Sequence, residues 1–127
     1  MILVDTSVWI DHLRKGSPAL ATALEQDRVL MYPFVLGELA CGNLRNRREV
    51  LRLLRDLPAA PTATHPEALD FIVRRALMGR GIGSIDVHVL ASATLAAPAR
   101  LWTRDRRLAA VAAELDLAFT ETGGGRP

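Results

Sequence analysis

The sequence predicts an α/β domain, a three-layer α/β/α sandwich around a central, mainly parallel sheet of short strands. Short aliphatic runs alternate along the chain with longer segments whose apolar residues recur every three or four positions, as in strands joined by helical crossovers. The first run, residues 2–4, is apolar at every position, which suits a strand covered on both faces of a parallel sheet. At 127 residues the chain can bury one core, and it shows no internal repeat.

The first half of the chain is expected to contain two strands and four helices. Thr6 or Ser7 can cap the first helix, and Ser17 followed by Pro18 is typical of a helix start. Pro33 suits the first turn of the third helix. In chain order, the expected elements are a strand at residues 2–4, helices at 8–13 and 19–26, a strand at 29–31, and helices at 33–41 and 46–57.

The second half begins with a proline-rich connector, residues 58–66, which is expected to include one weak strand near Thr62 and Ala63. The helix after it shows the clearest periodicity of the chain, and Ser84 is expected to cap the one that follows. The core-facing residues of the first of these helices are predicted to be Leu69, Ile72, Val73, Ala76 and Leu77. The other expected elements are a helix from 84 to before Pro98, a strand at 101–102, a helix through 108–115 and an edge strand at 118–120.

Residues 1–121 are expected to form the domain and the glycine-rich residues 122–127 a disordered tail. Because there is no apolar stretch of about 18 residues and no leader pattern, the sequence predicts a cytoplasmic protein without a membrane partner. The single Cys41 is expected to be a small buried hydrophobe, and Trp9 and Trp102 fit core packing. The histidines are scattered and none is expected to be catalytic: His12, His65 and His88.

Arginine carries almost all the positive charge, with Lys15 the only lysine, although the net charge is only +2. The arginines form three clusters: Arg45, Arg47, Arg48, Arg52 and Arg55; Arg74, Arg75 and Arg80; and Arg104, Arg106 and Arg107. A guanidinium matches phosphate in a bidentate manner, so one interpretation is that these clusters hold a nucleic-acid backbone. The other is that they are solvated helix faces paired with nearby acids: Glu49, Asp56 and Asp70.

Four acids stand out by their context. Asp5 and Asp105 each follow an apolar strand, Glu38 lies within an apolar helix surface, and Asp86 falls in the first turn of a helix. Ligands of open α/β sheets bind outside the carboxyl ends of the strands, so acids placed there are candidates for chemistry. Helix capping is the alternative for the three aspartates. Glu38 is harder to explain in that way, because a lone glutamate among apolar neighbours destabilises a fold unless it faces a cation.

Carboxylates that are brought together repel one another, and protons or metal ions relieve the repulsion. Hard oxygen ligands without a Cys or His cluster favour Mg²⁺ or Mn²⁺ over Zn²⁺. Such an ion activates water and neutralises the charge that builds on a phosphodiester under attack. Because this chemistry also fits the arginines, the hypothesis is a metal site for phosphodiester cleavage.

Four segments in this order carry a family resemblance: Val4-Asp5-Thr6-Ser7, Leu36-Gly37-Glu38-Leu39, Ile85-Asp86-Val87-His88-Val89-Leu90-Ala91-Ser92-Ala93 and Leu101-Trp102-Thr103-Arg104-Asp105. Together they resemble the PIN-domain ribonucleases. Within that superfamily the chain is most similar to the VapC class, the toxins of bacterial type II toxin–antitoxin pairs. The resemblance extends from residue 2 to about residue 120.

The resemblance implies a PIN-like nuclease domain at residues 1–121 with a pocket that binds Mg²⁺ or Mn²⁺. The implied metal-binding residues are Asp5, Glu38, Asp86 and Asp105, assisted by hydroxyls of Thr6 or Ser7 and of Thr103. Glu38 is expected to bind the metal through water or to orient the attacking water as a general base. The resemblance further implies endonucleolytic cleavage of RNA, a homodimer, and inhibition by a small VapB-like antitoxin that blocks the active site.

Two other classes of function are weighed against this one. A strand-terminal aspartate also suits an aspartyl-phosphate intermediate, but such sites usually need a second acid two residues on and a later lysine, and Asp5 is followed by Thr6 and Ser7. The second is a catalytically inactive PIN-like module that binds RNA or protein. All four acids are retained, which argues against an inactive module, and a metal-dependent nuclease assay discriminates between the two.

Overall fold

The computed structural model describes residues 1–96 and 99–121, so the expected tail at 122–127 and Pro98 lie outside the described residues. Within those ranges the chain forms three strands and seven helices. In chain order they are β1 (Ile2–Val4), α1 (Thr6–Lys15), α2 (Pro18–Glu25), β2 (Val29–Leu30), α3 (Pro33–Ala40), α4 (Arg47–Arg55), α5 (His65–Arg74), α6 (Ser84–Leu95), β3 (Arg100–Trp102) and α7 (Arg106–Glu114). Among the described residues, no helix has the length and apolar character that crossing a membrane requires.

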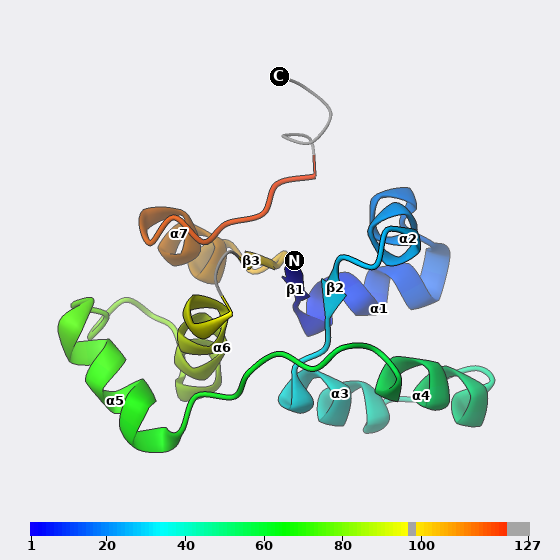
Figure 1. The fold of residues 1–127 in the computed structure, drawn as a ribbon, viewed down its shortest axis with the longest axis horizontal. Helices are drawn as coiled ribbons and strands as arrows, with labels where there is room; N and C mark the ends of the chain where they lie inside the picture. Colours follow the sequence, from blue (N-terminus) through cyan, green and yellow to red (C-terminus); the bar gives the residue numbers. More distant parts are fainter. Residues whose placement is uncertain (97–98, 122–127) are drawn as a thin grey trace.

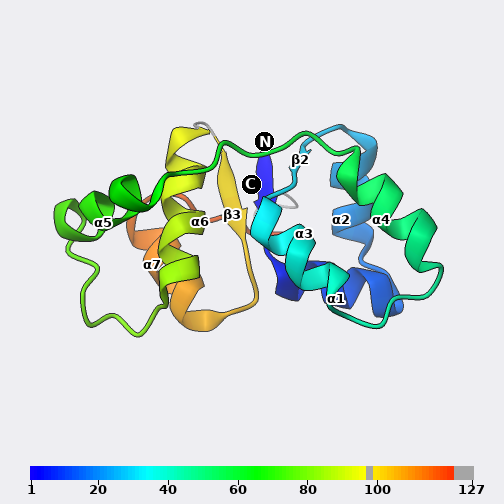
Figure 2. The same cartoon turned by 90° about the horizontal axis from the view of Figure 1, so that it is seen from below.

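The sheet is parallel throughout, with strand order β2-β1-β3. Leu3, in the central strand, pairs with Leu30 on one side and with Leu101 on the other. Helices α1 to α4 lie on one side of the strands and α5 to α7 on the other, which confirms the predicted three-layer α/β arrangement (Figures 1 and 2). Because the strands are parallel, their carboxyl ends lie at the same edge of the sheet, which is where the predicted site residues begin.

The core is centred on β1, all of whose side chains are buried. Trp9 and Trp102 are each only 2% exposed, so the prediction that they pack in the core is confirmed. Helix α1 packs on α3, and α5 packs on α6. These contacts fix the helices that carry Glu38 and Asp86 relative to the central strand.

Two predicted helix caps are wrong by one residue, and one is confirmed. Asp5, rather than Thr6 or Ser7, occupies the position before α1, yet its side chain makes no capping hydrogen bond. Gly83, rather than Ser84, precedes α6. Ser17 caps α2 as expected, since its hydroxyl accepts a hydrogen bond from the Leu20 N–H at 3.3 Å. The hydroxyls of Thr6 and Ser7 are therefore available for contacts outside their own helix.

The two weak strands that were expected are reduced to single bridges. The connector pairs with the sheet at Ala59, opposite Met31, rather than near Thr62 and Ala63. Ala63 instead donates its N–H to the buried hydroxyl of Ser92, so this N–H is not used in a strand pairing. The expected edge strand at 118–120 contributes one bridge to Leu101 in β3.

Two burial predictions are wrong as well. Helix α5 forms, but Leu69 and Val73 are 50% and 69% exposed, and the side chains that it buries are Ala68 and Phe71. Small Ala68 allows α5 to approach α6. Of the predicted core-facing residues, Leu77 is buried and Ile72 is half-buried, whereas Leu69, Val73 and Ala76 are exposed. Cys41 is exposed because it follows the last residue of α3, where the chain turns away from the core.

Candidate active site

The site begins where β1 and β3 end side by side. The Asp5 N–H continues the ladder by donating to the Trp102 carbonyl at 2.9 Å, which places Asp5 next to Thr103. The Thr103 hydroxyl donates to Asp5 Oδ2 at 2.7 Å, and the Ser7 hydroxyl donates to the same oxygen at 3.3 Å. Asp5 is half-buried, and these two bonds hold its carboxylate at the edge of the sheet.

Glu38 reaches the same edge from α3. Its Oε1 atom accepts a short hydrogen bond from the Thr6 hydroxyl, one residue after Asp5. The bond joins the first turn of α1 to the middle of α3, two helices that also pack against each other. Glu38 itself is exposed rather than enclosed by its apolar sequence neighbours, so desolvation does not penalise it as the sequence suggested, and its charge acts on Asp86.

Asp86 lies in the first turn of α6 and is half-buried. Burial raises the pKa of its carboxyl above the ordinary value, and a hydrogen bond from the Gly83 N–H, 3.3 Å long, partly offsets this. The negative charges of the other three predicted site acids raise the pKa of Asp86 further: Asp105, Asp5 and Glu38. The structure therefore brings all four acids near one another at one edge of the molecule.

Asp105 caps a helix, which was one of the two interpretations of this residue from the sequence. Its Oδ1 atom caps α7 by accepting hydrogen bonds from the N–H groups of Arg107 and Leu108 at 2.9 and 3.1 Å. Its own N–H donates to the Thr103 hydroxyl at 3.1 Å. Thr103 thus connects the backbone of Asp105 to the carboxylate of Asp5. The Oδ2 atom of Asp105 has no hydrogen bond from any described residue and stays available to a ligand.

The four carboxylates have the same pattern of hydrogen bonds. Each has one oxygen in a hydrogen bond and one oxygen without a bond from the residues described. None of the four forms an ion pair with a described residue, whereas seven other acids of the chain do. Four hard oxygen donors without a compensating cation match the chemistry that Mg²⁺ or Mn²⁺ requires.

The carboxylates do not yet enclose a metal ion. Among residues 1–96 and 99–121, no three His, Cys, Asp or Glu side chains are close enough together to hold one as they stand. Like charges repel, so carboxylates without a cation between them favour side-chain positions that keep them apart. Binding an ion therefore requires side-chain rotations of residues whose backbone positions are set by the elements that carry or flank them: β1, α3, α6 and α7.

Comparisons with known proteins agree with this geometry. The family model described as "PIN domain" matches residues 2–114. The chain belongs to the PIN-domain family. It is 48% identical over 121 residues to proteins named "Ribonuclease VapC32" from two strains of Mycobacterium tuberculosis, CDC 1551 / Oshkosh and ATCC 25618 / H37Rv, and the match covers 95% of this chain and 98% of each relative. The resemblance to a VapC-type PIN domain that the motifs predicted is confirmed.

Sequence reasoning missed the residues that hold this PIN domain's site segments in place. Arg104 pairs with Asp11 of α1 at 2.7 Å and with Glu121 at 2.9 Å. The Ser7 hydroxyl accepts a hydrogen bond from the Arg104 N–H at 3.0 Å. These contacts fasten the segment after β3 to α1 and so fix Asp105 near Asp5. No sequence pattern relates Asp11 to Arg104, since the two become neighbours only when β1 and β3 pair.

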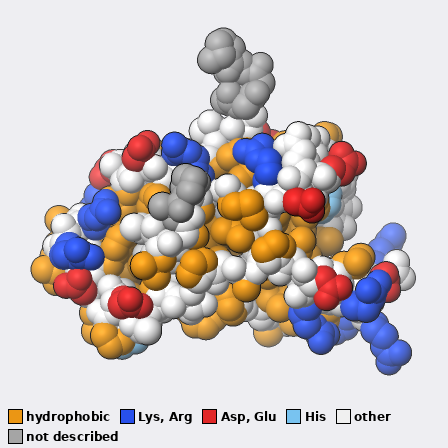
Figure 3. All heavy atoms as spheres, in the orientation of Figure 1, with side chains coloured by type: hydrophobic (Ala, Val, Ile, Leu, Met, Phe, Trp, Pro, Cys, Tyr) orange, Lys and Arg blue, Asp and Glu red, His pale blue; other side chains and the backbone are white. Residues whose placement is uncertain are grey.

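The arginine clusters of the PIN domain divide into two kinds. Several arginines are paired with acids, as the second interpretation of the sequence proposed: Arg52 with Glu49 and Asp56, Arg74 with Asp70, Arg80 with Glu114, and Arg104 as above. Figure 3 shows basic side chains gathered at the end of the molecule where Figure 1 places α4. Others have no side-chain hydrogen bond or ion pair with a described residue. One of these, Arg45, lines a groove that extends to Glu38, together with the equally unpaired Arg14 of α1, which lies outside the clusters.

Proposed function

We propose that this protein is a divalent-metal-dependent endoribonuclease that cleaves RNA phosphodiester bonds and acts as the toxin of a toxin–antitoxin pair. The observation that carries the proposal is the set of four unpaired carboxylates at the carboxyl edge of a parallel sheet, each with an oxygen left for a ligand. Membership of the PIN-domain family and the names of the VapC32 relatives support it.

The residues that would hold Mg²⁺ or Mn²⁺ are Asp5, Asp86 and Asp105, with Glu38 as a further ligand or a water-mediated one. The pKa of Asp86 is raised mainly by burial and further by the charges of Asp105, Asp5 and Glu38, and a cation would neutralise those charges. When bound, the ion supplies positive charge to the phosphodiester under attack. A site of oxygen ligands alone disfavours Zn²⁺, so magnesium or manganese is the expected cofactor.

The remaining site residues orient the acids. Thr103 and Ser7 donate to the same oxygen of Asp5, so its other oxygen is directed away from them. Thr6 does the same for Glu38. Glu38 is exposed, which allows it to reach a water molecule beside the substrate and accept its proton as a general base. These hydroxyls therefore position catalytic carboxylates rather than attack the substrate themselves.

The biological setting follows from the VapC type. We expect a small VapB-like antitoxin to neutralise the enzyme by blocking the active site, and we expect the enzyme to act as a homodimer in the cytoplasm. Family membership and the match to VapC32 over 98% of the relatives' length support these expectations. The antitoxin proposal is tested in two steps. The first is to look for a short neighbouring gene that encodes a DNA-binding antitoxin, and the second is to measure whether its co-expression relieves toxicity.

The test of the enzyme is Asp5→Asn, assayed on labelled RNA with Mg²⁺ or Mn²⁺. Asparagine keeps the shape of the side chain and removes its charge, so cleavage should be lost while the thermal stability changes little. The matched control is Asp70→Asn, which removes an exposed carboxylate that pairs with Arg74 on α5. Cleavage by Asp5→Asn at the wild-type rate would exclude the assigned site, and a wild-type protein that binds RNA without cutting it would indicate the inactive module instead.

A further inference from the structure

We propose that the groove between α1, α3 and α4 is the track for the single-stranded RNA substrate, with Arg14 and Arg45 binding its phosphates. The inference rests on the proposed ribonuclease function and goes beyond it, because it assigns substrate-positioning residues outside the acidic site. Position, charge and the character of the groove's walls each support it.

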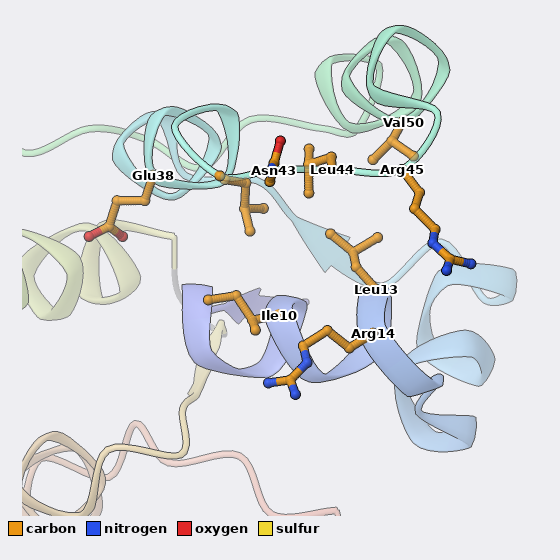
Figure 4. A pocket seen from close by; sticks show the side chains of 10 residues that line it. Ile10, Leu13, Arg14, Glu38, Asn43, Leu44, Arg45 and Val50 are labelled. Atoms are coloured by element: carbon orange, nitrogen blue, oxygen red, sulfur yellow. The ribbon is translucent and has the colours of Figure 1, made fainter.

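The groove is continuous with the candidate active site. It has a volume of about 590 Å³, and Glu38, one of the four site acids, is part of its lining. Figure 4 shows Glu38 at one end, with Arg14 extending from α1 on one wall and Arg45 from the segment before α4 on the other. A strand whose scissile phosphate lies at the acids therefore enters or leaves along this groove.

Arg14 and Arg45 have no side-chain hydrogen bond or ion pair with a described residue. Arg48, Arg55, Arg106 and Arg107 are unpaired as well, but only Arg14 and Arg45 of this set line the groove. No acid among the described residues forms an ion pair with Arg14 or Arg45, whereas Arg52, Arg74 and Arg80 are each paired. An exposed guanidinium with no partner presents its full fork of donors to phosphate. Two such groups on different walls of an open groove form a positive track for a polyanion.

The wall that carries Arg45 is held in place by another arginine. The Arg47 side chain donates hydrogen bonds to the carbonyls of Gly42, at 2.9 Å, and Ala40. Asn46 adopts a left-handed backbone conformation with φ of 50°, which turns the chain into α4. The segment that presents Arg45 is therefore fastened to the end of α3. Arg47 uses its guanidinium on backbone carbonyls, so it is a structural arginine and is not part of the track.

The walls between the charges are apolar. Ile10 is 43% exposed beside the half-buried Leu13, and Leu44 and Val50 lie opposite them. Exposed aliphatic side chains provide contact for unstacked bases and riboses, which single-stranded RNA offers and a base-paired helix hides. An alternation of guanidinium and apolar surface thus matches the alternation of phosphate and nucleoside in a single strand.

The experiment measures RNA binding and cleavage for Arg14→Ala and Arg45→Ala. The probe is a fluorescein-labelled single-stranded RNA of about 12 nucleotides, with binding followed by anisotropy in EDTA at several salt concentrations. Each variant should bind about 5- to 10-fold more weakly, and each should reduce the slope of log K against log salt by about 0.7. In cleavage assays KM should rise and kcat should stay unchanged. Arg14→Lys and Arg45→Lys should restore part of the affinity.

The matched control is Arg55→Ala. It removes the same charge from α4, at an exposed residue with no described partner that does not line the groove. If the wild type cuts RNA but the groove variants behave like Arg55→Ala, the groove assignment is overturned while the ribonuclease proposal stands. If the wild type does not cut RNA with Mg²⁺ or Mn²⁺, the proposed function itself fails. Loss of self-association in the groove variants with intact RNA binding would assign the groove to a second copy of the chain and overturn the proposal.

Discussion

The sharpest test of the site's design is Thr103→Val, which removes one hydroxyl and keeps the side-chain shape. That hydroxyl donates to Asp5 Oδ2 at 2.7 Å and accepts from the Asp105 N–H at 3.1 Å. After the substitution, the Asp5 carboxylate keeps only the longer bond from Ser7 at 3.3 Å. Thr103→Val therefore tests whether a positioning hydroxyl, rather than the acids alone, sets the geometry.

The expected loss of activity in Thr103→Val follows from the hydrogen bonds that the substitution removes. A hydrogen bond to a charged group contributes about 1.5–3 kcal/mol, and Thr103 is half-buried, so solvent replaces part of it. Partners that orient metal-binding side chains typically change metal affinity or activity by about 10- to 100-fold. We expect kcat/KM for RNA cleavage to fall by roughly that factor. The concentration of Mn²⁺ needed for half-maximal rate should rise.

The assay is cleavage of a labelled single-stranded RNA across a Mn²⁺ titration, with thermal unfolding measured in parallel. Thr103→Ser should retain most of the activity because it keeps the hydroxyl. Thr94→Val is the matched control, since its hydroxyl bonds only to the Leu90 carbonyl within α6 at 3.0 Å. A Thr103→Val enzyme within about twofold of wild type would refute the argument that this hydroxyl positions Asp5.

Three further predictions concern stability. Because the pKa of Asp86 is raised in the folded state, its contribution to stability is present at low pH and is lost as pH rises through that pKa. In EDTA, Asp86→Asn should therefore have a higher melting temperature than wild type at neutral pH, and the difference should shrink as the pH falls toward the ordinary pKa of an aspartate. A lower melting temperature at pH 7 would contradict this. Gly81→Ala should destabilise by about 1 kcal/mol, because φ is +80° there and the new methyl group would lie 2.9 Å from Arg107 Nη1. Gly37→Ala, inside α3 with no atom within 4 Å, should stabilise by about 0.5–1 kcal/mol, and chemical denaturation checks both glycine variants.

The sheet edge of the site was predictable because it depends on local patterns and one general rule. Apolar runs identified β1 and β3, and an acid after each run identified Asp5 and Asp105. Parallel pairing then places the ends of neighbouring strands together, whatever the rest of the chain does. Glu38 was recognisable for the opposite reason: its apolar neighbours offered it no partner on its own helix.

Contacts between residues distant in sequence could not be predicted. The Thr6–Glu38 bond, the partners of Arg104 and the proximity of Asp86 to the other acids depend on how helices pack across the sheet. The face of α5 was predicted wrongly for a related reason. Periodicity identifies an apolar stripe, but the small Ala68 rather than the larger Leu69 meets α6, and only the packed pair reveals that choice.

The distribution of unpaired charges links the two proposals. Glu38, Arg14 and Arg45 line one groove, yet no ion pair joins them. The negative charge of Glu38 and the positive charges of the arginines therefore stay available to ligands. A divalent cation at the acids and a phosphate chain along the arginines satisfy both sets at once. Each ligand then reduces the repulsion that the other would meet, and by linkage each must raise the affinity of the protein for the other by the same factor.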